Sequence, residues 1–203
     1  MKNNINVYQD IKKRLGIGVS FDVDYRQLII LGRKVQVYFV TGLCDTSVIQ
    51  QVLREMLHIN IREKVRDDLV EVLTNNLIHQ QVRKVKTMDE VVDELLSGLI
   101  IIFVDGHHEA FIVDIRSYPG RSPEEPDTEQ VIRGSRDGYT ENVVENTALT
   151  RRRLRDARLR NEMMKVGERS KTDVCISYIE DIASDGLVNM VKKRIKEIEI
   201  DGL

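Results

Sequence analysis

The chain has 203 residues, 41% of them apolar and 32% charged, a composition typical of a folded globular protein and not of a disordered chain. Its 31 basic and 33 acidic side chains leave a formal net charge of −2, so no overall field attracts it to nucleic acid or to an anionic membrane. The first twenty residues hold no apolar signal-peptide core, and the longest apolar run, residues 99–104, is far shorter than the roughly 20 residues of a membrane span. We therefore expect a soluble, intracellular chain.

Helix and strand patterns alternate along the first part of the chain. Apolar residues at helical spacing predict a helix over 5–15, and two β-rich runs on either side of Gly32-Arg33 predict a hairpin. Two further helices follow, and the first of them begins at Asp45, Thr46 or Ser47 as its cap. The expected ranges are 26–31 and 34–40 for the hairpin, then 45–58 and 65–79 for the two helices.

A capping box opens the next helix, because Thr87 is placed to accept a hydrogen bond from the Glu90 amide while Glu90 reaches back. We expect this helix to end at Gly98. The apolar run 99–104 predicts a strand covered on both faces, and the alternating run 109–115 predicts its hairpin partner. This order of elements favours a mixed sheet over a regular βαβ repeat. Residues 1–115 are thus expected to form an α/β subdomain, within an α+β protein.

The three prolines of the chain lie within eight positions of one another and predict a linker over 116–126. After it, the pattern predicts a helix over about 138–153, capped by Asp137 or Thr140, and then strands over 159–166 and 172–179. A last helix begins at Ser184-Asp185, with Leu187, Val191, Ile195 and Ile198 on one stripe. Residues 127–203 are therefore expected to form a smaller αββα subdomain.

The sequence contains no recognisable motif of a catalytic or metal site. His107-His108-Glu109 has ligand-type side chains, but neighbours on a strand point to opposite faces, so a polar hairpin turn is the better interpretation. Gly16-Ile17-Gly18 does not follow a strand and lacks the third glycine of a dinucleotide site. We expect no catalytic residue, no metal and no cofactor. Cys44 and Cys175 are expected to be buried free thiols in a reducing compartment.

The candidate interaction residues lie in a glycine-containing turn and in the basic cluster after it. Residues 151–160 hold six arginines and one acid, Asp156, and on one helix Arg151, Arg155 and Arg158 would share a face. The cluster predicts either contact with an anionic surface or a solvated helix end whose arginines pair with nearby acids. The turn predicts a structural joint in preference to a ligand site. The candidates are Arg133, Gly134, Arg136, Asp137, Gly138, Arg151, Arg152, Arg153 and Arg155.

These motifs carry a family resemblance. The stretch from Glu125-Pro126-Asp127 through Arg133-Gly134-Ser135-Arg136-Asp137-Gly138-Tyr139, followed by the run Asn146-Thr147-Ala148-Leu149-Thr150-Arg151-Arg152-Arg153, resembles the signature of the GerA family of spore germination proteins. The family includes the A subunits of nutrient germinant receptors. Ser135 and Asp137 stand where a receptor more often has proline and glutamate. The turn is therefore more similar to a sporulation branch of the family.

The resemblance implies a function that the residues alone do not. Family members continue from a soluble N-terminal region into membrane-spanning helices of the spore inner membrane, with this region facing the spore core. Their complexes are thought to be oligomeric channels that release cations early in germination. The chain would then be an assembly and gating module without enzymatic activity. Its expected partners are further copies of itself, other membrane subunits and lipid headgroups.

Two other function classes stay open at this point. The first is a small-ligand receptor domain, with a cleft between the two subdomains. The second is a nucleic-acid-binding module that uses the cluster at 151–160, and its binding would weaken steeply with salt. The near-zero net charge and the lack of aromatic residues near the cluster count against the second class, so no nucleic-acid partner is expected.

Overall fold

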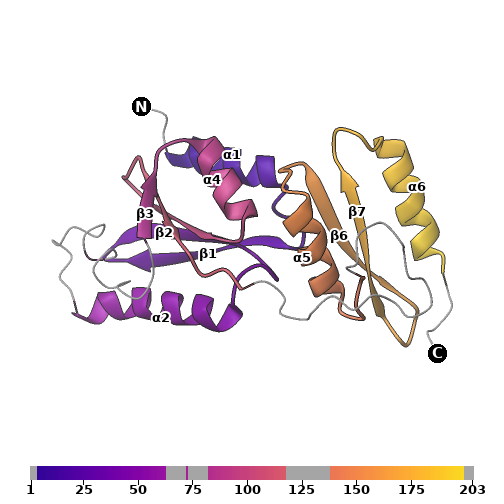
Figure 1. The fold of residues 1–203 in the computed structure, drawn as a ribbon, viewed down its shortest axis with the longest axis horizontal. Coiled ribbons are helices and arrows are strands. Elements are labelled where there is room, and N and C mark those ends of the chain that lie inside the picture. Colours follow the sequence, from indigo (N-terminus) through magenta and orange to yellow (C-terminus); the bar gives the residue numbers. More distant parts are fainter. Residues whose placement is uncertain (1–3, 63–71, 73–81, 118–137, 199–203) are drawn as a thin grey trace, which may run out of the picture.

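The structure is a computed structural model that describes residues 4–62, 72, 82–117 and 138–198 (Figure 1). Two lobes lie side by side along the long axis of the molecule. The N-lobe, residues up to 117, contains a five-stranded sheet, and the C-lobe, residues 138–198, contains a two-stranded sheet. The expected α+β fold with two subdomains is confirmed. The exact boundaries at 115 and 127 stay a prediction, although Ser117 still donates to the Leu43 carbonyl of the N-lobe at 3.0 Å.

The N-lobe sheet has the strand order β1-β2-β4-β5-β3. All four pairings are antiparallel, so the expectation of a mixed sheet is wrong. The reason is topological. The β1–β2 and β4–β5 hairpins join through β2 and β4, and β5 lies between β3 and β4, so the crossover through α4 makes no parallel pair. The strands are β1 (Val23–Ile30), β2 (Arg33–Val40), β3 (Val82–Val85), β4 (Ile100–Val104) and β5 (Ala110–Val113).

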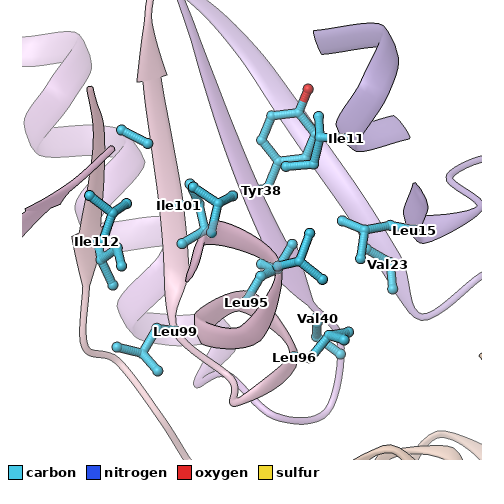
Figure 2. Close-up of a cluster of buried hydrophobic side chains, with 14 of the residues drawn as sticks. Ile11, Leu15, Val23, Tyr38, Val40, Leu95, Leu96, Leu99, Ile101 and Ile112 are labelled. Atoms are coloured by element: carbon cyan, nitrogen blue, oxygen red, sulfur yellow. The ribbon is translucent and has the colours of Figure 1, made fainter. Parts of the chain in front are cut away.

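Helices cover both faces of this sheet (Figure 1). On one face, α2 (Thr46–Arg62) packs its buried Val52, Met56 and Ile59 against the strands. On the other face lie α1 (Asn4–Leu15) and α4 (Met88–Leu96), and Figure 2 shows Leu95, Leu96 and Ile11 directed toward the strand residues. Residues of β4 alternate between the two clusters and all are buried. The apolar run 99–104 is therefore a strand covered on both faces, as predicted.

Local sequence signals set the ends of these elements. The hairpin loop is Leu31-Gly32, with φ of 48° and 77°, one residue earlier than expected, and two positive φ values match the turn that two-residue hairpins favour. Thr87 Oγ1 accepts from the Glu90 amide at 3.3 Å, as the capping box predicts. Asp45 caps α2 by accepting from the Ser47 amide at 2.8 Å. The expected helix over 65–79 falls outside the described residues except for Val72, which is helical.

The C-lobe is an αββα unit, as expected. Its sheet pairs β6 (Leu159–Val166) with β7 (Thr172–Ile179) at the predicted bounds, between α5 (Val143–Arg153) and α6 (Asp185–Lys196) (Figure 1). Helix α5 begins five residues later than expected, and its cap is Asn142, which accepts from the Val144 amide at 3.0 Å. The delay has a local cause, because the Asn146 side chain makes two 2.7 Å hydrogen bonds to the Thr140 backbone and holds it in a turn.

The last helix is capped by Ser184, as predicted, through a 3.3 Å hydrogen bond from the Leu187 amide. Its expected apolar stripe is only partly correct. Val188 is the buried residue of α6, whereas Leu187 and Ile198 are about half exposed. The helix is therefore rotated so that the stripe lies between the sheet and the solvent.

Candidate functional site at the junction of the two lobes

The junction between the lobes contains a cluster of buried polar side chains. Ser20 and Asp22 come from the segment between α1 and β1, Arg151 from the last turn of α5, and Arg160 and Asn161 from β6. None of the five is more than 3% exposed. Burying charged groups costs several kcal/mol unless they are paired and hydrogen-bonded. The charged side chains of each lobe therefore need hydrogen-bonding partners from the other lobe.

The Arg151 guanidinium and the Asp22 carboxylate form a bidentate ion pair across the junction. Nε lies 2.9 Å from Oδ2 and Nη2 lies 3.2 Å from Oδ1, and both side chains are 1% exposed. Nη1 donates to the Asp156 carbonyl and Nη2 also donates to the Leu159 carbonyl, each at 3.2 Å. A planar guanidinium can bind a carboxylate with two parallel hydrogen bonds and still donate to carbonyl groups, which the ammonium group of lysine cannot do in the same geometry.

Asn161 connects the same carboxylate to the sheet of the C-lobe. Its Nδ2 donates to Asp22 Oδ2 at 2.9 Å, and its Oδ1 accepts from the Ser177 hydroxyl at 2.7 Å. Two backbone amides donate across the junction at the same place: Asn161 N–H to Ser20 Oγ and Phe21 N–H to the Asn161 carbonyl, both at 2.9 Å. Backbone and side-chain hydrogen bonds thus hold the two lobes together.

Arg160 packs its guanidinium against Gly16 of the N-lobe. Gly16 has a φ of +61°, which favours glycine, and a Cβ at this position would lie 2.4 Å from Arg160 Nε, so a larger residue would require the arginine side chain to move. The guanidinium donates to the Ala157 carbonyl at 2.6 Å and pairs with Glu180 at 2.5 Å. The glycine thus leaves the space that the arginine fills.

Helix α5 also packs directly on the N-lobe. Ala148 is 1% exposed and belongs to the apolar cluster shown in Figure 2, although the sequence places α5 in the C-terminal subdomain. Gly42, with a φ of +85°, allows the close approach, because a Cβ there would lie 2.8 Å from Ala148 Cβ. The helix is therefore shared by both lobes.

The structure corrects the interpretation of Arg151 as a surface residue. It is fully buried in the junction, and it shares no helical face with Arg155 and Arg158, because α5 ends at Arg153. The chain turns out of the helix at residues 154–158. Charge reversal at Arg151 is therefore expected to disrupt the junction.

The other candidates have different outcomes. Arg152, Arg153 and Arg155 are exposed, and Arg155 Nη1 donates to Ser97 Oγ at the end of α4 at 3.1 Å. Gly138 lines a shallow hollow with Tyr139 and Arg153 on the surface of α5. Arg133, Gly134, Arg136 and Asp137 lie outside the described residues. Whether any of these residues contacts a partner stays a prediction.

A cleft for a small ligand between the lobes stays a prediction. The hollow beside Tyr139 encloses about 190 Å³, below the roughly 300–1,000 Å³ of typical ligand pockets, and it lies on α5, away from the junction. Within the described residues, no group of three His, Cys, Asp or Glu side chains is arranged to hold a metal ion. His107 lies in the β4–β5 turn, as expected, with Nε2 3.2 Å from Arg33 Nη1.

Both cysteines are free thiols, as predicted, but only Cys44 is buried. Burial raises the pKa of Cys44 to about 11, and its Sγ donates to the Gly98 carbonyl at 3.1 Å. Cys175, on β7, is half-buried, and its thiol pKa is raised by burial as well. Neither thiol has the lowered pKa of a reactive cysteine.

The loop that joins α5 to β6 is expected to make stability depend on acidic pH. Hydrogen bonds from the Arg158 side chain lower the pKa of Asp156 to about 2. Since the ordinary value is about 3.9, this contribution is present above pH 4 and is lost as the pH falls toward 2. We expect Asp156→Asn to have a lower Tm than the parent chain at pH 6 and to approach it by pH 2, and Arg158→Gln to behave alike. A Tm difference that does not change with pH would contradict this assignment.

Comparison with known proteins places the chain in a family. Residues 9–203 match the model of the Bacillus/Clostridium GerA spore germination proteins. The chain belongs to the GerA family. It is 56% identical over 192 residues to stage V sporulation protein AF of Bacillus subtilis, covering 95% of this chain and 39% of that protein, so the expected sporulation branch is confirmed. Spore germination protein KA of the same organism is 31% identical over 191 residues, covering 92% of this chain and 35% of its own length.

A solved structure supports the fold of this GerA-family chain. The N-terminal domain of the A subunit of the Bacillus megaterium germinant receptor GerK3 aligns with a TM-score of 0.72 and 26% identity, covering 96% of this chain and 71% of that one. The chain spans about two fifths of the length of stage V sporulation protein AF. Helices of the described ranges are all too short or too polar to cross a bilayer.

Proposed function

We propose that the chain is the N-terminal domain of a GerA-family membrane protein of the spore, where it acts as an assembly and gating module of an oligomeric ion channel on the core-facing side of the inner membrane. The observation that carries this proposal is the similarity of 96% of the chain to an N-terminal receptor domain. Two facts support the membrane setting: the chain spans only part of its relatives, and YfkQ of Bacillus subtilis, 34% identical over 167 residues, is named a membrane protein.

The junction supports a mechanical role. A module that transmits movement has to respond as one body, and the lobes share a buried ion pair, two hydrogen bonds from backbone amides and a helix that packs on both. Separating them would expose the apolar contact at Ala148 to water and break the hydrogen bonds that cross the junction. A force on one lobe is thereby passed to the other. We assign no reaction to this domain.

The assembly surface is proposed to include Arg152 and Arg153. Both are exposed on the last turn of α5, next to the buried Arg151, and their charge is complementary to an acidic partner surface. Exposed charges of this kind contribute more to the rate and specificity of association than to the fold.

A chimera tests the proposal. The matching 192-residue stretch of stage V sporulation protein AF is replaced by this chain in Bacillus subtilis, with and without Arg152→Glu/Arg153→Glu. We expect the unaltered chimera to assemble and to support cation release during germination, and the double variant to lower recovery of the detergent-extracted complex about tenfold. The matched control, Arg26→Glu/Lys34→Glu, reverses two exposed charges on the N-lobe sheet and should assemble normally.

Two results would count against the proposal. Full-length protein that lacks this domain yet assembles and germinates normally would overturn the role as a module. Normal complex recovery with Arg152→Glu/Arg153→Glu would remove these arginines from the assembly surface.

A further inference from the structure

Helix α6 carries apolar side chains on the face that no other described element covers. Leu187 and Met190 are 51% and 45% exposed, and with Arg194 they fall on one side of the helix at steps of three and four residues. Ile198, 44% exposed, follows two residues after the helix ends at Lys196. Val188, the buried residue, points to the β6–β7 sheet instead. Figure 1 shows α6 on the outer side of this sheet, at the end of the molecule away from the N-lobe.

Two basic residues accompany this apolar face: Arg194 lies on it and Lys193 lies beside Met190, whereas Lys196 is on the opposite side of the helix. Lys193, Arg194 and Lys196 are exposed in the last turns of α6, and the acids on the helix are Asp185 in the first turn and Glu197 after the last. Lys193 lies only 3.9 Å from Glu197, a surface pair of small energy. A fourth cation, Lys192, turns inward to Glu162 at 2.6 Å and fixes the rotation of the helix. An apolar stripe beside cations is typical of helices that lie in a membrane interface.

The size of the face favours a lipid surface over a second protein. Twelve residues at about 1.5 Å each give a helix only about 18 Å long, too small a surface to supply the roughly 800 Å² that each partner buries in a stable protein interface. Insertion into a headgroup layer has no such minimum area, and its strength follows from the apolar side chains and the cations together. The exposed cations complement anionic lipid.

We propose that the outer face of α6 lies in the headgroup region of an anionic bilayer, with Leu187 and Met190 toward the acyl chains and Lys193 and Arg194 at the phosphates. This inference rests on the proposed function, in which the domain belongs to a membrane protein. It places the lipid contact expected for the arginine cluster on α6. The C-lobe then rests on the membrane, and the N-lobe extends away from it (Figure 1).

Vesicle binding by the 203-residue chain tests the proposal. We expect the chain to float with vesicles of phosphatidylglycerol and phosphatidylcholine but not with phosphatidylcholine alone. Leu187→Ser/Met190→Ser should weaken binding about tenfold or more by removing apolar insertion. Lys193→Glu/Arg194→Glu should weaken it at least as much at low salt, since each lost cation is worth roughly fivefold. The control Ile29→Ser/Leu57→Ser replaces two comparably exposed apolar residues of the N-lobe and should bind like the parent chain.

The outcomes separate this inference from its alternatives. Circular dichroism of each variant should match the parent chain, because the substituted side chains are exposed. Absence of parent-chain binding to phosphatidylglycerol vesicles, or equal binding by the α6 variants, would overturn the proposal. So would a dimer in light scattering that Leu187→Ser/Met190→Ser dissociates, because that result would assign the face to a second copy. Either failure leaves the chimera test of the proposed function standing.

Discussion

Arg151→Met is expected to destabilise the chain by about 3–5 kcal/mol, although the substitution lies within a run of three arginines that reads as a surface patch. Removing the guanidinium leaves the Asp22 carboxylate in a site that is 1% exposed, where the Asn161 amide still donates to it but no positive charge compensates it. The carboxylate then has to be protonated or solvated, and both require the lobes to move apart. Urea unfolding at pH 7 measures the loss.

The matched control is Arg152→Met, the same substitution at the next residue of α5, where the side chain is exposed. It should change the free energy of unfolding by no more than about 0.5 kcal/mol. The double variant Asp22→Asn/Arg151→Met should lose less than the sum of its single variants, because no uncompensated charge remains. Equal effects of Arg151→Met and Arg152→Met would refute the buried ion pair.

Gly42→Ala is expected to cost about 1–3 kcal/mol more than Gly106→Ala. The two glycines have nearly the same backbone conformation, with φ of +85° and +86°, so the strain of a left-handed alanine is common to both. They differ in surroundings. A Cβ on Gly42 would lie 2.8 Å from Ala148 Cβ and 3.3 Å from the Val144 carbonyl, whereas a Cβ on Gly106 meets nothing within 4 Å.

The atoms in the way belong to the backbone and the first side-chain atom of α5, so no rotamer change relieves the contact. Relief requires α5 to move away from the N-lobe, which would also stretch the ion pair at Arg151. Chemical denaturation of both variants gives the difference directly. If Gly42→Ala were no less stable than Gly106→Ala, α5 would not be packed tightly against the N-lobe.

Much of the fold follows from local patterns in the sequence. The strands at 159–166 and 172–179, the caps at Thr87 and Ser184 and the buried strand after Gly98 all rest on signals that span fewer than ten residues. Such signals depend on backbone geometry and on burial of one face, which neighbouring residues set among themselves. The order of strands in the sheet needs contacts between distant segments, and there the expectation of a mixed sheet fails.

The junction shows why the sequence alone did not predict the buried polar cluster. Asp22 and Arg151 are 129 positions apart, and neither lies in a recognisable motif. The sequence therefore gives no sign that the two side chains form a pair. In the sequence Arg151 looks like its neighbours Arg152 and Arg153, and only the packing of α5 on the N-lobe selects it for burial. A faint signal did exist in β6, where Arg160, Asn161 and Glu162 follow one another. A strand with three successive polar residues has no purely apolar face, and it needs polar partners elsewhere.

The junction gives the family signature a physical meaning. The run that ends in three arginines supplies one residue to the interior and two to the surface, and Thr147 and Ala148 of the same run are buried in the contact with the N-lobe. The arginine run of the signature thus contributes both to the contact between the lobes and to the exposed, charged last turn of α5. We expect a domain built in this way to move as one body.

Native-state hydrogen exchange tests that claim most directly. The amides of Asn161 and Phe21 donate across the junction, and the amide of Ile101 lies in the central strand β4 of the N-lobe. If the lobes are one cooperative unit, all three amides should exchange with the same free energy of opening, equal to that of global unfolding. Exchange of the two junction amides at a free energy several kcal/mol below that of Ile101 would show that the lobes separate on their own, and would contradict the account.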